Sequence, residues 1–158
     1  MTHRKPAESP RDLAGVLRPG QRLLGLDVGT KTIGVALSDT GRAIASPYST
    51  IRRRKFAQDA EALAEIIAAN DVGGAIIGLP VNMNGSEGPR CQSVRQFAAN
   101  LGAKLALDVA FWDERLSTVA ATRTLIEADM SRQRRAEVVD KVAAAYILQG
   151  ALDFLGRG

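Results

Sequence analysis

Two short apolar runs near the start of the chain predict a β-hairpin. Residues 23–28 and 32–38 are rich in Leu, Ile and Val, and a glycine-containing turn at 29–31 joins them. This arrangement is typical of two antiparallel strands. Because side chains alternate between the faces of a strand, Asp27 shares a face with Gly25. The pattern therefore places one carboxylate on an otherwise apolar strand, beside a glycine that lets another group come close.

The rest of the chain alternates between strand-like and helix-like patterns. The expected elements are a more exposed strand over 43–51, an amphipathic helix over 56–70, a strand covered on both faces over 74–79, a helix that Ser86 and Pro89 open and Gly102 closes, a strand over 104–112, a helix over 118–128, a basic loop over 129–136 and a last helix over 137–155. This order predicts an α/β domain over 21–158 with a mixed sheet. Residues 1–20, which are rich in Pro, Arg and Gly, are expected to form a flexible arm that is either mobile or loosely docked.

Three acidic side chains stand at positions that call for a partner. A buried charge without compensation costs several kcal/mol, so Asp27 needs either a local donor such as a backbone N–H or Lys31, or a divalent cation. Glu114 follows the strand over 104–112 and shares the face of Trp112. Asp140 lies on the apolar face of the last helix, although an acid near the start of a helix is also favoured by the helix dipole alone.

The composition limits the kinds of catalytic and metal site that the chain can form. Among 158 residues there is one His, at position 3, and one Cys, at position 91. A Ser-His-Asp or Cys-His arrangement and a zinc site of His and Cys ligands are therefore excluded within the domain. A hydrolase built from this chain would rely on carboxylates that hold Mg²⁺ or Mn²⁺. The net charge of +4 favours an anionic partner such as nucleic acid.

The chain shows no membrane-spanning run of about 20 apolar residues and no secretory signal. A single cysteine fits a reducing compartment, so a cytoplasmic location without a membrane partner is expected. A mixed sheet with a helix packed on it can bring Asp27, Glu114 and Asp140 together. Three carboxylates in contact repel one another unless cations neutralise them, and a pair of Mg²⁺ or Mn²⁺ ions would do so.

Four segments carry a family resemblance. GLDVGTKTIGVALSD, GLPVNMNGSEG, FWDERLSTVAA and DKVAAAYIL, in this order, closely resemble the YqgF family of the RNase H-like superfamily, over about residues 22–155. Members of that family are described as Holliday junction resolvases or pre-16S rRNA nucleases. The resemblance implies an RNase H-like fold, a mixed five-stranded sheet with helices on both faces. It also implies a metal-dependent acidic site in which Asp27, Glu114 and Asp140 are the catalytic residues and metal ligands.

The resemblance further implies a substrate and its contacts. Lys31, Asn82 and Arg115 match motif positions and are expected to bind substrate phosphate or to orient the site. The basic segments 52–55 and 132–135 either contact phosphates as well or are solvated surface. The implied task is hydrolysis of phosphodiester bonds in 5′-end maturation of pre-16S rRNA, and the alternative is cleavage of Holliday junctions.

The expected partners follow from that choice. They are precursor rRNA or branched DNA, with ribosomal particles as an optional further partner, and the protein would be a monomer or a homodimer. Junction cleavage calls for a symmetric dimer, whereas RNA trimming does not. Two other classes stay open from the residues. The Asp-x-Gly-Thr hairpin also resembles the phosphate-binding hairpin of ATP-binding phosphotransferases, and the same fold could be a non-catalytic nucleic-acid-binding module.

Overall fold

The protein is built on one five-stranded sheet with the order β3-β2-β1-β4-β5. The computed structural model describes residues 5–117, 119 and 132–156. Strands β1, β2 and β3 form an antiparallel meander, while β4 and β5 extend the sheet in parallel from β1. The strands are β1 (Arg22–Val28), β2 (Thr32–Ser38), β3 (Ala45–Arg52), β4 (Val72–Leu79) and β5 (Asp108–Asp113). The predicted hairpin and mixed sheet are confirmed.

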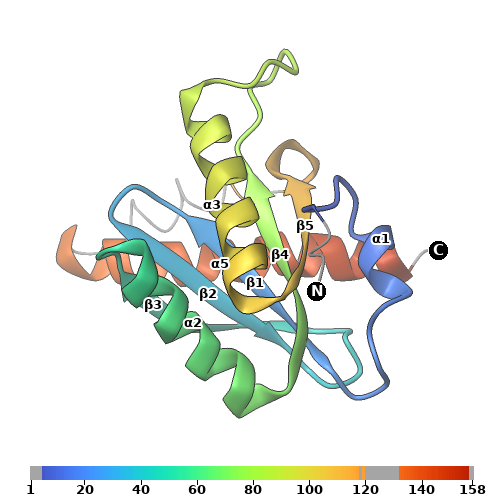
Figure 1. Ribbon diagram of the computed structural model, residues 1–158. Helices are drawn as coiled ribbons and strands as arrows, with labels where there is room; N and C mark the ends of the chain where they lie inside the picture. The colour runs from blue at the N-terminus through green and yellow to red at the C-terminus, as the bar shows by residue number, and fades with distance from the viewer. Residues whose placement is uncertain (1–4, 118, 120–131, 157–158) are drawn as a thin grey trace.

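Helices cover both faces of the sheet, as predicted (Figure 1). Helices α2 (Phe56–Asn70) and α3 (Pro89–Leu105) lie on one face, and the long helix α5 (Arg132–Gly156) crosses the other. Two short elements complete the described part of the chain: α1 (Arg11–Ala14) and the 3-10 turn η1 (Glu114–Leu116). Among the described residues, no helix combines the length and the apolar character needed to cross a membrane.

The alternation of side chains along the strands divides the core into two layers. Large aliphatic side chains pack between the sheet and helices α2 and α3, and they include Leu24, Leu26, Val35, Ile77 and Phe111. The other layer lies under α5 and is made of smaller side chains together with Leu23, Ile76, Trp112 and Ile147. Adjacent residues of one strand therefore belong to different cores.

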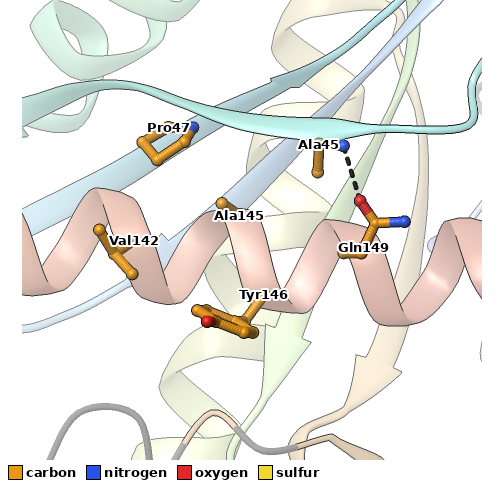
Figure 2. A pocket seen from close by; sticks show the side chains of 6 residues that line it. All are labelled: Ala45, Pro47, Val142, Ala145, Tyr146 and Gln149. Atoms are coloured by element: carbon orange, nitrogen blue, oxygen red, sulfur yellow. Dashed lines mark hydrogen bonds between the residues drawn. The ribbon is translucent and has the colours of Figure 1, made fainter. Parts of the chain in front are cut away.

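Glycines let α5 approach the sheet closely. A Cβ atom on Gly25 would stand 2.7 Å from the Cβ of Leu148, and one on Gly34 would overlap the carbonyl group of Asp140. The helix is also fastened to β3, because Gln149 accepts from the N–H of Ala45 at 2.8 Å (Figure 2). These contacts fix the rotation and the height of α5 above β1 and β2.

Two predicted boundaries are wrong. Helix α3 continues through Gly102 to Leu105, and Ala106 ends it with a left-handed φ of 51°. Gly102 serves packing instead, since a Cβ there would stand 3.2 Å from the carbonyl oxygen of Leu107. The strand expected from Lys104 consequently begins only at Asp108.

The last helix also starts earlier than its pattern indicates. Backbone that was expected to form a basic loop up to residue 136 is helical from Arg132 onward. Arg, Gln and Ala are good helix formers, so the propensity of this segment outweighs its polarity. The helix predicted over 118–128 lies outside the described residues, apart from residue 119.

The sequence leaves a mobile and a loosely docked arm open for residues 1–20, and from residue 5 onward the segment is docked. The N–H of Ala7 donates to the Val109 carbonyl, and its own carbonyl accepts from Phe111, both at 2.8 Å. Leu13 is only 2% exposed, and Glu8 forms an ion pair with Arg95 at 2.8 Å. Backbone hydrogen bonds to β5, one ion pair and the burial of Leu13 together dock this segment onto the domain.

Candidate active site

Asp27 occupies the second-last position of β1 and is 5% exposed. It lies directly opposite Gly34 of β2 in the antiparallel register. Its neighbours of the same face, Leu23 and Gly25, pack under α5. The structure thus places Asp27 on the α5 side of the sheet, as the alternation predicted.

Asp140 reaches the same place from α5. Its carbonyl group lies against Gly34, the residue opposite Asp27, and its carboxylate accepts a hydrogen bond from the Thr32 hydroxyl. Because α5 begins at Arg132, Asp140 is about two turns inside the helix. The alternative that it is merely a first-turn acid favoured by the dipole is therefore wrong, since that effect fades beyond the first turn.

Glu114 reaches the same face of the sheet from the end of the edge strand β5. It is the first residue of η1, directly after β5, and Asp113 caps this turn by accepting from the N–H of Arg115. A Cβ on Gly78 would stand 3.3 Å from the carboxyl carbon of Glu114. Glu114 therefore lies over β4, in the space that the missing side chain of Gly78 leaves.

The three acids border a single row of the sheet. Leu26 of β1 pairs with Ile77 of β4, so the next residues along these parallel strands, Asp27 and Gly78, are neighbours. Gly34 of β2 lies on the other side of Asp27. The backbone carbonyl of Asp140 lies over Gly34, and the carboxyl group of Glu114 lies over Gly78, so the two residues stand on opposite flanks of Asp27. Gly34 and Gly78, on the strands either side of β1, leave space next to Asp27 for these two residues.

The acids do not form a closed ligand set. Among the described residues, no three His, Cys, Asp or Glu side chains make a group that could hold a metal ion. The donor chemistry nevertheless suits Mg²⁺ or Mn²⁺, which prefer carboxylate oxygens and take one or two of them together with water and substrate oxygens. The Asp140 carboxylate is turned toward Thr32, and its release would free an oxygen for a cation.

Arg115 is held beside the site by an ion pair. Its guanidinium donates to both carboxylate oxygens of Asp113, with the shortest contact at 2.7 Å. These bonds hold the pKa of Asp113 below its ordinary value and raise the pKa of Arg115, against the opposing effect of burial. Arg115 also reaches the carbonyl of Met83, at 3.5 Å, in the loop after β4.

Asn82 shapes that loop. Its N–H donates to the Ser86 carbonyl, its carbonyl accepts from Gly85, and its side-chain amide donates to the Ser86 hydroxyl. Gly85 has a φ of 88°, which a side chain would strain. Asn82 is exposed, as the sequence predicts for a residue at the carboxyl end of a strand, but the contacts described here are structural.

Lys31 lies in the turn between β1 and β2 and is exposed. It borders a pocket of about 560 Å³ whose other lining residues are Thr30, Thr32, Arg52 and Arg53. A second pocket, of about 330 Å³, lies between β3 and α5 (Figure 2). No charged side chain of the described residues lines this second pocket, so of these two pockets the first is the one that suits an anion.

Thr32 is the site residue that the sequence does not single out. Its hydroxyl is the donor that engages Asp140, although 108 positions separate the two residues. The available signal was the small-residue face of β2, formed by Gly34, Ala36 and Ser38, which begins at Thr32. That face indicates close packing but not which helix packs there.

Comparisons with known proteins agree with this architecture. A protein from Paramagnetospirillum magneticum named "Putative pre-16S rRNA nuclease" is 64% identical over 94% of this chain and 96% of its own length. One of the same name from Roseobacter denitrificans is 59% identical over 92% of this chain and 91% of its own. These relatives span nearly the whole molecule.

Solved structures show the fold. RuvC of Thermus thermophilus, in complex with a Holliday junction substrate, superposes with a TM-score of 0.53 at 9% identity, over 86% of this chain and 96% of its own. The yeast mitochondrial Holliday junction resolvase gives a TM-score of 0.51 at 11% identity, over 93% of this chain and 84% of its own. The fold is RNase H-like, which confirms the expected fold class.

The family assignment rests on the sequence. Residues 21–154 match the model of the RuvX family, described as Holliday junction resolvase. This match covers all four motifs that carry the resemblance to YqgF, and it confirms that resemblance. The chain belongs to the RuvX family of RNase H-like nucleases.

Proposed function

We propose that the protein is a metal-dependent nuclease whose task is the 5′-end maturation of pre-16S rRNA. The observation that carries this proposal is the position of Asp27, 5% exposed between Gly34 and Gly78, with Asp140 and Glu114 on either flank. The names of the relatives that share 59% and 64% identity support the RNA substrate.

In this proposal Asp27, Glu114 and Asp140 hold Mg²⁺ or Mn²⁺. When bound, such cations lower the pKa of water and neutralise charge that develops on the phosphate oxygens. The surrounding residues of the chain hold the three acids in position. The strand fixes Asp27, the Asp113-capped turn η1 fixes Glu114, and the Thr32 hydroxyl orients Asp140.

Substrate contacts come from the rim of the site. Lys31 is exposed next to the turn that follows Asp27, and Arg115 is held beside Glu114 by its pair with Asp113. Asn82 holds the loop that Arg115 contacts. These three residues are proposed to bind or to position backbone phosphates in a cytoplasmic RNA, free or within a ribosomal particle.

The test is a cleavage assay with purified protein. RNA that spans the 5′ end of 16S rRNA and its leader should be cut in Mg²⁺ or Mn²⁺, and EDTA or Asp27→Asn should stop the reaction. Stabilisation by ATP in a melting assay, without any cleavage, would instead support the phosphotransferase alternative. Failure to cut RNA and DNA of every form tested would refute the nuclease proposal.

Holliday junction cleavage is the second candidate. The observation that favours it is the description of the matching family, which covers residues 21–154. Two symmetric incisions need two active sites, so this function calls for a dimer on the junction. A four-way junction cut in paired, symmetric positions by a complex of two chains, with the RNA left intact, would establish it in place of RNA maturation.

A further inference from the structure

The turn between β1 and β2 and the end of β3 enclose a basic pocket beside the acids. It has a volume of about 560 Å³ and is lined by Thr30, Lys31, Thr32, Arg52 and Arg53. One of its walls is Thr32, whose hydroxyl donates to the Asp140 carboxylate. The pocket and the proposed metal site therefore share a wall.

The strand pleat gives the two arginines different roles. Arg52 pairs with Thr32 across β2 and β3, so both side chains leave the same face of the sheet, which is the face of Asp140. Arg52 is exposed, and its charge is available to a ligand in the pocket.

The guanidinium of Arg53, in contrast, is occupied by contacts within the protein. Its guanidinium donates to the Gly29 carbonyl at 2.7 Å, lies 3.8 Å from the carboxylate of buried Asp59, and stacks over the Phe97 ring at 5.3 Å. Its backbone N–H also donates to the carbonyl of Lys31 at 2.9 Å. Arg53 thus fixes the turn that carries Lys31, and it leaves Lys31 and Arg52 as the two exposed cations of the lining.

We propose that this pocket binds one backbone phosphate of the substrate strand, next to the phosphate that is cleaved. The proposal rests on the nuclease function and names a contact for it. Arg52 can present a forked pair of N–H donors, and Lys31 adds a compact charge. None of the described residues that line the pocket is aromatic, so they offer no surface for base stacking and would bind a phosphate without regard to sequence.

The salt dependence of RNA binding reports how many backbone phosphates the protein contacts. Binding of a fluorescein-labelled single-stranded RNA from the 16S leader is measured in the Asp27→Asn background, which prevents cleavage, over a range of KCl concentrations. The slope of log K against log salt changes by about 0.7 for each phosphate contact on a single strand. Arg52→Ala should reduce the slope by about one contact, and Arg52→Lys should retain most of it.

The matched control is Arg54→Ala. Arg54 belongs to the same basic run and is exposed, but it does not line the pocket, so its loss should leave the slope unchanged within error. The double variant Lys31→Ala/Arg52→Ala should lose no more than Arg52→Ala alone, about one contact, because Lys31 only adds charge at the phosphate that Arg52 anchors. The melting temperature of each variant is measured to verify that the variant is folded.

The outcomes separate the two proposals. Equal slopes for Arg52→Ala and Arg54→Ala, in a protein that binds and cleaves RNA, overturn the pocket and leave the nuclease function intact. A loss of two contacts in the double variant overturns the single-phosphate pocket. Absence of binding and of cleavage by the wild-type protein, on RNA and on junction DNA alike, overturns both proposals.

Discussion

The two faces of the sheet are made from the same strands but do different work. Toward α2 and α3 the strands present large aliphatic side chains such as Leu26 and Ile77, both 0% exposed. Toward α5 the same strands present Gly34, Gly78 and the carboxylate of Asp27. The face toward α2 and α3 supplies stability along its whole length, whereas the face toward α5 leaves space for the acids around Asp27. Neighbouring positions should therefore separate stability from activity.

The largest expected effect belongs to Asp27→Asn. Removing the charge keeps the shape of the side chain, so folding is retained, but cleavage should fall at least about a thousandfold, or about 4 kcal/mol in activation free energy. Single-turnover cleavage of leader RNA measures the loss. Asp71→Asn is the control, because Asp71 is exposed at the end of α2 and Asn also accepts its left-handed φ of 50°. Full activity in Asp27→Asn would remove this residue from the mechanism.

Leu26→Ala tests the opposite face, one residue away. Leu26 is 0% exposed in the core under α2 and α3, so truncation should cost about 2–5 kcal/mol in the free energy of unfolding. Urea unfolding measures this cost. The cleavage rate of the folded protein, at low temperature and without urea, should change little. A protein that keeps its stability but loses activity would contradict the division between the faces.

Gly34→Ala should disturb both properties at once. The added methyl group overlaps the carbonyl of Asp140, so α5 must lift or rotate. We expect a loss of about 1–3 kcal/mol in unfolding free energy, together with reduced cleavage, because the Asp140 carboxylate moves with the helix. Gly15→Ala is the control, since nothing lies within 4 Å of the added Cβ. Wild-type activity in Gly34→Ala would show that the height of α5 is unimportant.

The smallest expected effect concerns the rim of the site. Because Arg115 lowers the pKa of Asp113 in the folded state, their pair stabilises the protein above the ordinary Asp pKa, and this contribution is lost as the pH falls through the lowered pKa. The pair is partly exposed, so Asp113→Asn should cost less than about 1 kcal/mol at pH 7. The free energy of unfolding is measured by urea denaturation at pH 7 and in acid. The difference in this free energy between wild type and Asp113→Asn should be smaller in acid than at pH 7. A difference that grows in acid would reverse the assigned sign.

Local patterns predicted the elements whose signals are local. The hairpin was predicted from its two apolar runs and its turn, and the helix over 56–70 matches α2 at both ends. The predicted end of the helix that begins at Pro89 was wrong, because packing and not local sequence determines the role of its glycine. Gly102 looks like a helix terminator, yet it is buried inside α3, and the helix ends at Ala106, a residue type that gives no such warning.

The candidate site shows the same limit. Alternation and helical spacing placed Asp27 and Asp140 on the correct faces, because those periods are properties of the chain itself. The contact between Thr32 and Asp140, and the separate roles of Arg52 and Arg53, depend on which elements meet in space. Whether the three acids bind metal stays a prediction, since no three acidic, His or Cys side chains of the described residues form a group that could hold an ion.

The N-terminal segment has a consequence for how the molecule behaves among its own copies. By pairing with Val109 and Phe111, Ala7 occupies backbone groups along the outer side of β5, an edge strand of the sheet. At the opposite edge, Pro47 of β3 brings no N–H to offer a neighbour. Unpaired strand edges invite aggregation, so both margins of this sheet are protected against it. A chain that lacks Ala7 and the residues before it would regain an open edge at β5 and the tendency to self-associate.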